Sequence, residues 1–169
     1  MATPTDTSPL SPLTTSLIRL VPVAATFAVT MCHLDQHLIF SSFASPTAAS
    51  RGAHHVLPHT MRRYVRGVLP FVIALEAAAQ SCMAAVVWQR GPLWRWYAVG
   101  LAGFFVHLAN APYAWRLLTA IRDDEAKAGR PEALARFVRM NKLRLVGTEV
   151  PLLVIVVWGA LAPVVGGKV

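Results

Sequence analysis

Four apolar runs of membrane-spanning length constrain the fold of this chain more than any other feature. They cover about residues 17–38, 68–88, 96–116 and 145–165. A helix needs about 20 apolar residues to cross the hydrocarbon core of a bilayer, and each run is close to that length. Of the 169 residues, 55% are hydrophobic and 14% charged, and the mean hydropathy is +0.49. The sequence therefore predicts an all-α fold, a four-helix transmembrane bundle that forms a single membrane domain over residues 1–169.

The distribution of basic residues predicts how this bundle is oriented. The chain has 16 Lys and Arg against 8 Asp and Glu, a net charge of +8. Twelve of the 16 lie in, or directly beside, the segments that join the first run to the second and the third run to the fourth. Basic residues collect on the cytosolic side of membrane proteins. We therefore expect 39–67 and 117–144 to be cytosolic loops and both termini to lie on the non-cytosolic side. Topology accounts for the charge, and no nucleic-acid partner is predicted.

The amino-terminal segment differs in composition from the runs. Residues 1–16 are rich in Thr, Ser and Pro, which predicts a disordered tail. The segment has neither a basic region nor an evident cleavage site, so we expect the first run to be retained as a membrane span.

Each apolar run brings ionisable side chains toward the end that faces the basic segments. The first run carries His33 and His37, the second Glu76 and the third His107, while Arg144 stands at the entry of the fourth. Ionisable groups inside a bilayer are costly, face the bundle interior and mark functional sites. At about 1.5 Å of rise per residue these groups reach similar depths. The sequence predicts one polar pocket in the cytosolic half of the bundle, open to the cytosolic side.

Two chemistries fit these residues, and the sequence leaves both open. His33 and His37 have the spacing of a helical metal-binding pair, which His107 or Glu76 could complete. Without a metal, an imidazole or carboxylate beside Arg144 can take a proton from an acidic carbon and hold the resulting anion. The chain has no nucleotide-binding loop, no Gly-x-Ser-x-Gly turn and no His-Glu-x-x-His helix.

Two short stretches of the chain resemble a known family. Residues 137–144 read Phe-Val-Arg-Met-Asn-Lys-Leu-Arg and lead into the fourth run, and Pro112-Tyr113 closes the third. With the four-run layout at this length, they resemble the anthrone oxygenases, small integral membrane proteins of fungal polyketide pathways with relatives in bacteria. The Asn-x-x-Arg step of that family maps onto Asn141 and Arg144.

The chain also departs from this family. Phe137 stands where the family often has Trp, and residues 114–116 read Ala-Trp-Arg where Thr and Asn usually follow the proline.

The resemblance implies oxygenation of an aromatic polyketide, the conversion of an anthrone to an anthraquinone in secondary metabolism. No cofactor is required, because deprotonation gives an enolate that can pass an electron to O2 directly. On this hypothesis His33 or His107 is the catalytic base, Glu76 orients it and Arg144 stabilises the oxyanion. The residues assigned to substrate binding are His37, Asn110, Tyr113 and Asn141, with Asn141 assisting Arg144.

Two other function classes stay open at this point. A non-enzymatic carrier, or a tether for soluble pathway enzymes, is favoured by the basic segment 120–144, which can dock acidic surfaces or anionic lipids. A metal-dependent membrane oxidase would use His33, His37 and His107 as ligands. The expected partners of the enzyme are a small hydrophobic aromatic substrate, O2 and the lipid bilayer. The membrane would be the endoplasmic reticulum in a fungus or the inner membrane in a bacterium.

Overall fold

The fold is helical throughout the part of the chain that the structure describes. The structure is a computed structural model that describes residues 12–50, 52–90, 93–123 and 130–165. Its elements, in chain order, are α1 (Pro12–Phe43), α2 (Pro46–Ser50), the 3-10 turn η1 (Ala53–His55), α3 (Leu57–Trp88), α4 (Trp94–Ala109), α5 (Ala111–Asp123), α6 (Arg130–Arg144), the π-helical turn η2 (Leu145–Glu149) and α7 (Val150–Val165).

Three helical stretches in the described residues are long and apolar enough to cross a membrane. They are Leu13–Phe43, Leu57–Trp88 and Pro131–Ala162, the last of which joins α6, η2 and α7. These stretches are consistent with a multi-pass membrane protein. They correspond to the first, second and fourth apolar runs of the sequence.

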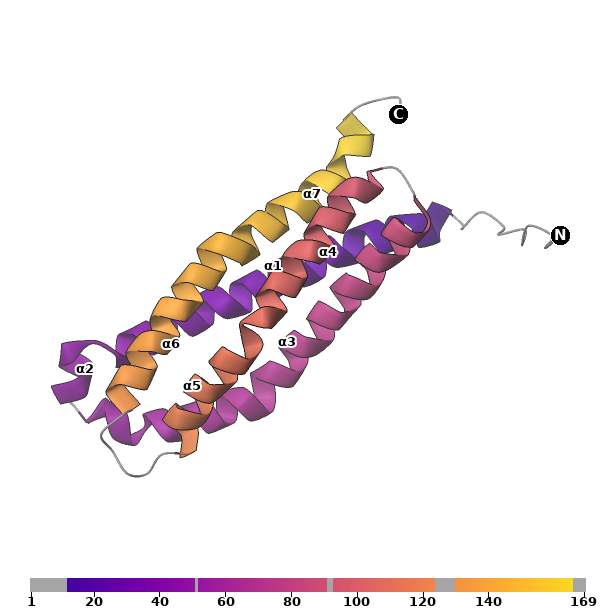
Figure 1. Ribbon diagram of the computed structural model, residues 1–169. Helices are drawn as coiled ribbons and strands as arrows, with labels where there is room; N and C mark the ends of the chain where they lie inside the picture. Colours follow the sequence, from indigo (N-terminus) through magenta and orange to yellow (C-terminus); the bar gives the residue numbers. More distant parts are fainter. Residues whose placement is uncertain (1–11, 51, 91–92, 124–129, 166–169) are drawn as a thin grey trace.

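The long helices pack side by side into one bundle (Figure 1). α3 lies between α1 and the α4–α5 pair, and α6–η2–α7 closes the other side by packing on α1, α4 and α5. α4 and α5 follow one another along α3. α1 begins and α7 ends at the same end of the bundle.

The third apolar run is not one continuous helix. The sequence predicts a span over 96–116, but α4 ends at Ala109, Asn110 forms a turn and α5 begins at Ala111. Pro112 explains the break, because it has no N–H to donate and its ring clashes with the carbonyl of the residue four positions earlier. Proline suits the first turn of a helix, which is where α5 places it. As a result, neither α4 nor α5 meets the length of a membrane span by itself.

The fourth run contains a local widening of the helix. Leu145–Glu149 forms a π-helical turn in which the N–H of Val150 reaches back to the carbonyl of Leu145. Pro151 follows directly, and its ring would clash with the carbonyl of Gly147 in a regular helix. The wider turn relieves this clash, and it places Glu149 at its last position. Single π turns of this kind are frequent at functional sites.

The helices extend beyond the predicted spans. α1 continues to Phe43 and α3 begins at Leu57, so much of the predicted loop 39–67 is helical. The predicted loop 117–144 is likewise occupied by the end of α5 and by α6, which continues into η2 and α7. α1 begins at Pro12, inside the predicted tail of residues 1–16, and residues 1–11 lie outside the described part of the chain.

Two apolar clusters hold the bundle together. The loop-end cluster lies toward α2 and comprises Phe40, Leu57, Met61, Ala114, Leu117, Leu118, Ile121, Ala133, Leu134, Phe137 and Met140. The terminal-end cluster lies toward the chain ends and comprises Ala25, Ala79, Met83, Val86, Tyr97, Phe104, Leu152 and Val156. Along α1, along α3, along α4–α5 and along α6–η2–α7, a stretch of chain separates the two clusters, and the buried polar residues fall in that stretch.

Candidate functional site

Six polar side chains meet between the two apolar clusters, and we call them the polar layer. They come from all four sides of the bundle. α1 contributes His33 and Gln36, α3 contributes Glu76, α4 contributes His107, and the continuous stretch α6–η2–α7 contributes Arg144 and Glu149. Five of the six residues are at most 8% exposed, and the Arg144 side chain is 12% exposed. Polar groups buried at this depth must satisfy one another, because neither hydrocarbon nor the apolar clusters can bind them.

Glu149 is the centre of this layer. One of its carboxylate oxygens, Oε1, lies 2.8 Å from Nδ1 of His33 and 2.9 Å from Nδ1 of His107. The two imidazole rings stack, with centroids 5.7 Å apart and an interplanar angle of 27°. A single carboxylate oxygen therefore lies close to both rings, at the same type of nitrogen in each.

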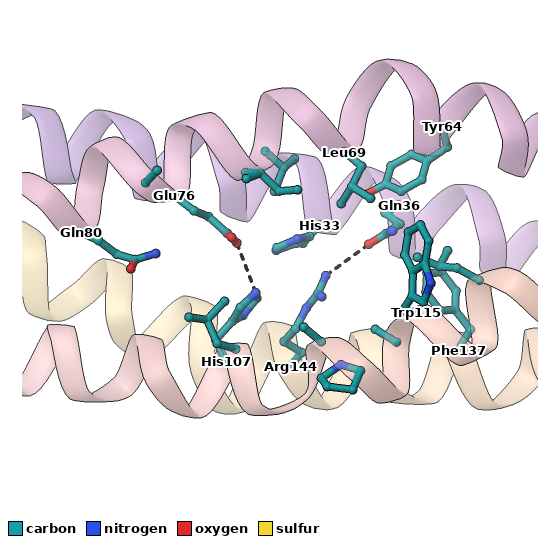
Figure 2. Close-up of a pocket in the computed structure, with 18 residues that line it drawn as sticks. His33, Gln36, Tyr64, Leu69, Glu76, Gln80, His107, Trp115, Phe137 and Arg144 are labelled. Atoms are coloured by element: carbon teal, nitrogen blue, oxygen red, sulfur yellow. Dashed lines mark hydrogen bonds and ion pairs between the residues drawn. The ribbon is translucent and has the colours of Figure 1, made fainter.

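His107 differs from His33 in having a second carboxylate. Its Nε2 lies 3.2 Å from Oε1 of Glu76 (Figure 2). Its Nδ1 faces Glu149. Both ring nitrogens donate only when the imidazole carries two protons. His33 contacts a carboxylate through Nδ1 alone, which leaves its Nε2 as the nitrogen that can act on a ligand.

Arg144 completes the layer on the side away from Glu76. Its Nη2 donates to Oε1 of Gln36 at 3.3 Å, and its Nε lies 3.7 Å from Oε1 of Glu149. Figure 2 shows Gln36 lying between Arg144 and Tyr64, with the guanidinium extended toward the centre of the cavity. The guanidinium brings positive charge to the place where His33 also points.

A cavity of about 660 Å³ opens beside the polar layer. Its polar wall contains His33, Gln36, Glu76, His107 and Arg144. Apolar and aromatic side chains form the remaining walls: Tyr64, Leu69, Val72, Ile73, Ala77, Leu108, Ala111, Pro112, Ala114, Trp115, Leu118 and Phe137, with Gln80 at one end. A volume of this size lies in the usual range for a small-molecule site, and a mostly apolar lining with a few convergent polar groups is typical of one.

The structure brings the four predicted catalytic residues together. His33, Glu76, His107 and Arg144 all line the cavity, and they come from four different helices. Their roles in a reaction are a separate matter, and they stay predictions.

The four residues predicted to bind substrate lie outside this cavity. His37 is half-buried one helical turn beyond His33 and does not line it. Asn141 is fully buried beside Phe137, also without lining it. Asn110 and Tyr113 line a different pocket, formed with α6, and the Asn110 side chain donates to the carbonyl of Val106 at 3.1 Å.

Sequence reasoning left two members of the polar layer out of the site. Glu149 has the same signal that identified Glu76, a carboxylate within an apolar run, but its position close to the basic segment made it less conspicuous. Gln36 has no charge and stands beside Asp35, so no pattern singled it out.

The predicted metal ligands are not gathered at one point. Among the residues that the structure describes, no group of three or more His, Cys, Asp and Glu side chains is arranged to hold a metal ion. His37 is separated from the cavity that His33 and His107 share. Both nitrogens of His107 and Nδ1 of His33 face carboxylate oxygens instead.

Comparison with known proteins gives one distant likeness. No family model matches the chain, and no solved structure matches it. The chain is 28% identical over 151 residues to a protein named probable epoxidase scpX from Mollisia scopiformis, an alignment that covers 80% of this chain and 88% of that protein. This likeness suggests an oxygenase-like family of fungal secondary metabolism and supports an oxygenase-type function.

Proposed function

We propose that this protein is a membrane oxygenase that acts on a flat aromatic substrate such as an anthrone. The observation that carries the proposal is the pairing of His33, at the wall of a mostly apolar cavity, with Glu149 behind it. A base beside a carboxylate, next to a guanidinium and inside a mostly apolar site, is suited to removing a proton from a weakly acidic carbon.

His33 is the base in this proposal, and Glu149 orients it. The carboxylate holds Nδ1–H, so the lone pair on Nε2 is available for the substrate proton. His107 is less suited to this role, because both of its nitrogens face carboxylates. Its part is to fix Glu149 and Glu76 in place. This assignment narrows the sequence-based hypothesis, which left His33 and His107 as alternatives and gave the orienting role to Glu76.

Arg144 stabilises the negative charge that forms when the proton leaves. In an anthrone the methylene between the two rings loses a proton to His33, and the electron pair moves onto the ketone oxygen, which becomes an enolate. Arg144 can donate to this oxygen through a planar pair of N–H groups. Such preorganised donors are usually the largest single contribution to catalysis.

Oxygen then reacts with the enolate without a further reductant. The enolate passes one electron to O2, and the two radicals combine to form a carbon–oxygen bond. The resulting peroxide anion takes the proton back from His33 and becomes a hydroperoxide. Loss of the remaining hydrogen on that carbon, with cleavage of the oxygen–oxygen bond, releases water and leaves a second ketone. One anthrone and one O2 therefore give one anthraquinone and one H2O, and His33 returns to its starting form.

The likeness to a probable epoxidase supports a second candidate at the same site. If the substrate is a hydroquinone, His33 removes a phenolic proton and the ring carbanion adds O2. Loss of the second phenolic proton then lets the adjacent ring carbon attack the inner oxygen of the hydroperoxide. The oxygen–oxygen bond breaks, hydroxide leaves and takes up a proton to become water, and an epoxyquinone is formed. One hydroquinone and one O2 yield one epoxyquinone and one H2O, so this reaction also needs no external reductant.

The experiment that tests both candidates is oxygen uptake by the purified protein in lipid nanodiscs under ¹⁸O2. With anthrone we expect one O2 consumed per anthraquinone formed, and one ¹⁸O atom in the product. A hydroquinone probe is run beside it and analysed for a labelled epoxide. Rates with both probes no higher than in empty nanodiscs would contradict the oxygenase and favour a carrier or tether.

We further propose that α4 and α5 together form a fourth, interrupted span, with both chain ends on the non-cytosolic side. The basic residues between the spans support this orientation. A reporter that is active only in the cytosol, fused after Val169, is expected to stay silent, and the same reporter inserted in the segment 124–129 is expected to be active. The reverse pattern would contradict the orientation.

A further inference from the structure

We infer that the cavity opens sideways into the bilayer, between α3 and the α4–α5 break, and that its substrate enters from the lipid rather than from water. The inference rests on the proposed function in taking this cavity as the substrate site. It differs from the sequence-based prediction, which has the pocket open toward the cytosolic side.

Both ends of the cavity are closed by packed side chains. The loop-end cluster fills the space between the cavity and the connecting segments, with Met61, Ile121 and Leu134 at most 1% exposed. The terminal-end cluster fills the other end, where Met83 and Val156 are equally buried. Close-packed interiors of this kind leave no room for a tricyclic molecule. An approach along the bundle axis is therefore blocked from either side.

The remaining opening has an apolar rim. Ile73 on α3, Leu108 on α4 and Trp115 on α5 all line the cavity, and they are 56%, 40% and 48% exposed. The polar groups behind them, His33 and Glu76, are at most 8% exposed. Figure 2 looks into this opening, with α3 on one side and α4–α5 on the other.

The rim lies at a depth that hydrocarbon occupies. α3 has 32 residues and is about 48 Å long, and Ile73 stands about 24 Å from its start. The hydrocarbon core is about 30 Å thick, so Ile73 lies within the core wherever that core falls along α3. Leu108 and Ala111 flank the helix break on the opposite side. The break thus provides the gap through which a flat molecule can pass.

The contrast between rim and interior defines the substrate class. A molecule that dissolves in hydrocarbon crosses the rim without losing any hydrogen bond, whereas a strongly hydrated one would have to shed its water. Inside the cavity the molecule meets a base and the cation Arg144. These groups favour a molecule with a weakly acidic carbon next to a ketone or phenol, because they stabilise its anion. The geometry points to a neutral, flat, lipid-soluble molecule that becomes anionic only within the cavity.

The first test uses spin labels and needs no turnover. In a Cys32→Ala/Cys82→Ala background, Ile73→Cys reports on the rim, and Ala74→Cys, exposed on the same helix but outside the cavity lining, is the matched control. In liposomes we expect both labels to be accessible to O2 and protected from a water-soluble nickel complex. Added anthraquinone, which the reaction does not consume, should slow the label at position 73 and leave the label at position 74 unchanged.

Three results would overturn the inference. Access of the nickel complex to position 73 would mean that the cavity opens to water. Dipolar broadening between labels at position 73, lost on dilution with unlabelled protein, would mean that a second copy covers the opening. An equal response of both labels to anthraquinone would mean that the probe only dissolves in the surrounding lipid.

The second test narrows the opening. Ala77 lines the cavity and Ala78 does not, although both are exposed and adjacent on α3. Ala77→Phe should lower kcat/KM for anthrone about tenfold, because the larger side chain narrows the path by which the substrate enters. Ala78→Phe should behave as wild type, and equal kinetics for the two variants would contradict the inference. A wild type that binds anthraquinone at position 73 without oxidising anthrone would remove the proposed function and leave the lateral opening in place.

Discussion

The polar layer and the two apolar clusters are built from the same helices, but their side chains are held in place by different interactions. In the clusters, side chains such as Met83 and Phe137 are held by packing, and exchange of one apolar residue for another of similar size is tolerated. In the polar layer each group is held by a specific partner, and Glu149 alone contacts two imidazoles and faces a guanidinium. A bundle that needed only stability would extend the clusters through this layer.

Under the proposed function, this difference marks where the chain gives up stability for chemistry. Burying ionised groups is expensive, and a well-packed apolar layer of similar volume is often as stable or more stable. Substitutions in the polar layer are therefore expected to lower activity strongly and stability little. Substitutions in the apolar clusters are expected to lower stability strongly and activity little. The following predictions test this contrast, from the largest expected effect on activity to the smallest.

Glu149→Gln should have the largest effect. The amide keeps the size of the side chain but can turn an N–H toward His33. His33 then loses the contact that orients its ring, and the protonated nitrogen faces the substrate in place of the basic one. We expect kcat for anthrone to fall on the order of 10³-fold or more, with KM little changed. Glu149→Asp, which keeps the carboxylate, should recover part of the activity. Equal activity of Glu149→Gln and wild type would show that the carboxylate does not position the base.

Arg144→Lys keeps the positive charge and loses the planar pair of donors. If these donors stabilise the enolate, the turnover number should fall on the order of 10²-fold. The matched control is Arg139→Lys, which makes the same change on the same helix at an exposed position outside the cavity. Product formation in membranes with equal amounts of each protein is the measurement. Near-equal rates for the two variants would remove Arg144 from the chemistry.

Glu76→Gln should have a smaller effect than either change. His107 then keeps its contact with Glu149 and loses only the contact through Nε2. We expect turnover to fall roughly tenfold, because the base itself is untouched and only its neighbour is loosened. A loss as large as that of Glu149→Gln would point to Glu76 as the base and would contradict the assignment of His33.

Met83→Ala should affect stability and not chemistry. Met83 is fully buried in the terminal-end cluster, against Gly100 of α4. Its truncation leaves a cavity and should cost about 2 kcal/mol or more of folding free energy. Thermal unfolding in detergent should occur at a lower temperature, while the rate per folded molecule stays that of wild type. A large loss of kcat without a change in Tm would contradict the separation between clusters and polar layer.

The composition and periodicity of the sequence were enough to predict a helical membrane protein and the meeting of four polar residues. Four polar residues are conspicuous because each interrupts or borders an apolar run: His33, Glu76, His107 and Arg144. A bundle has one interior, so polar side chains that must be buried meet there. The lengths of the helices were harder to predict. Charged segments favour a loop at the membrane surface, yet the ends of α1 and α5 continue as amphipathic helices beyond the apolar runs.

The differences between the expected and the observed positions of site residues follow from the two helix irregularities. A regular helix would keep Asn110 on the same face as His107, but the break caused by Pro112 turns the chain there. Asn110 and Tyr113 consequently face α6 and its pocket. The π turn shifts the residues after Leu145 by one position relative to a regular helix, and it brings Glu149 onto the polar layer.

The central claim is that His33 removes a carbon-bound proton from a substrate in the cavity. Its most direct test is the rate of oxidation of anthrone carrying deuterium on the reactive methylene, measured for wild type, His33→Gln and His37→Gln. We predict a primary isotope effect in the wild type and in His37→Gln, which lies on the same helix outside the cavity. We predict a loss of rate on the order of 10²-fold or more in His33→Gln. A His33→Gln variant with the wild-type rate and the same isotope effect would contradict the account.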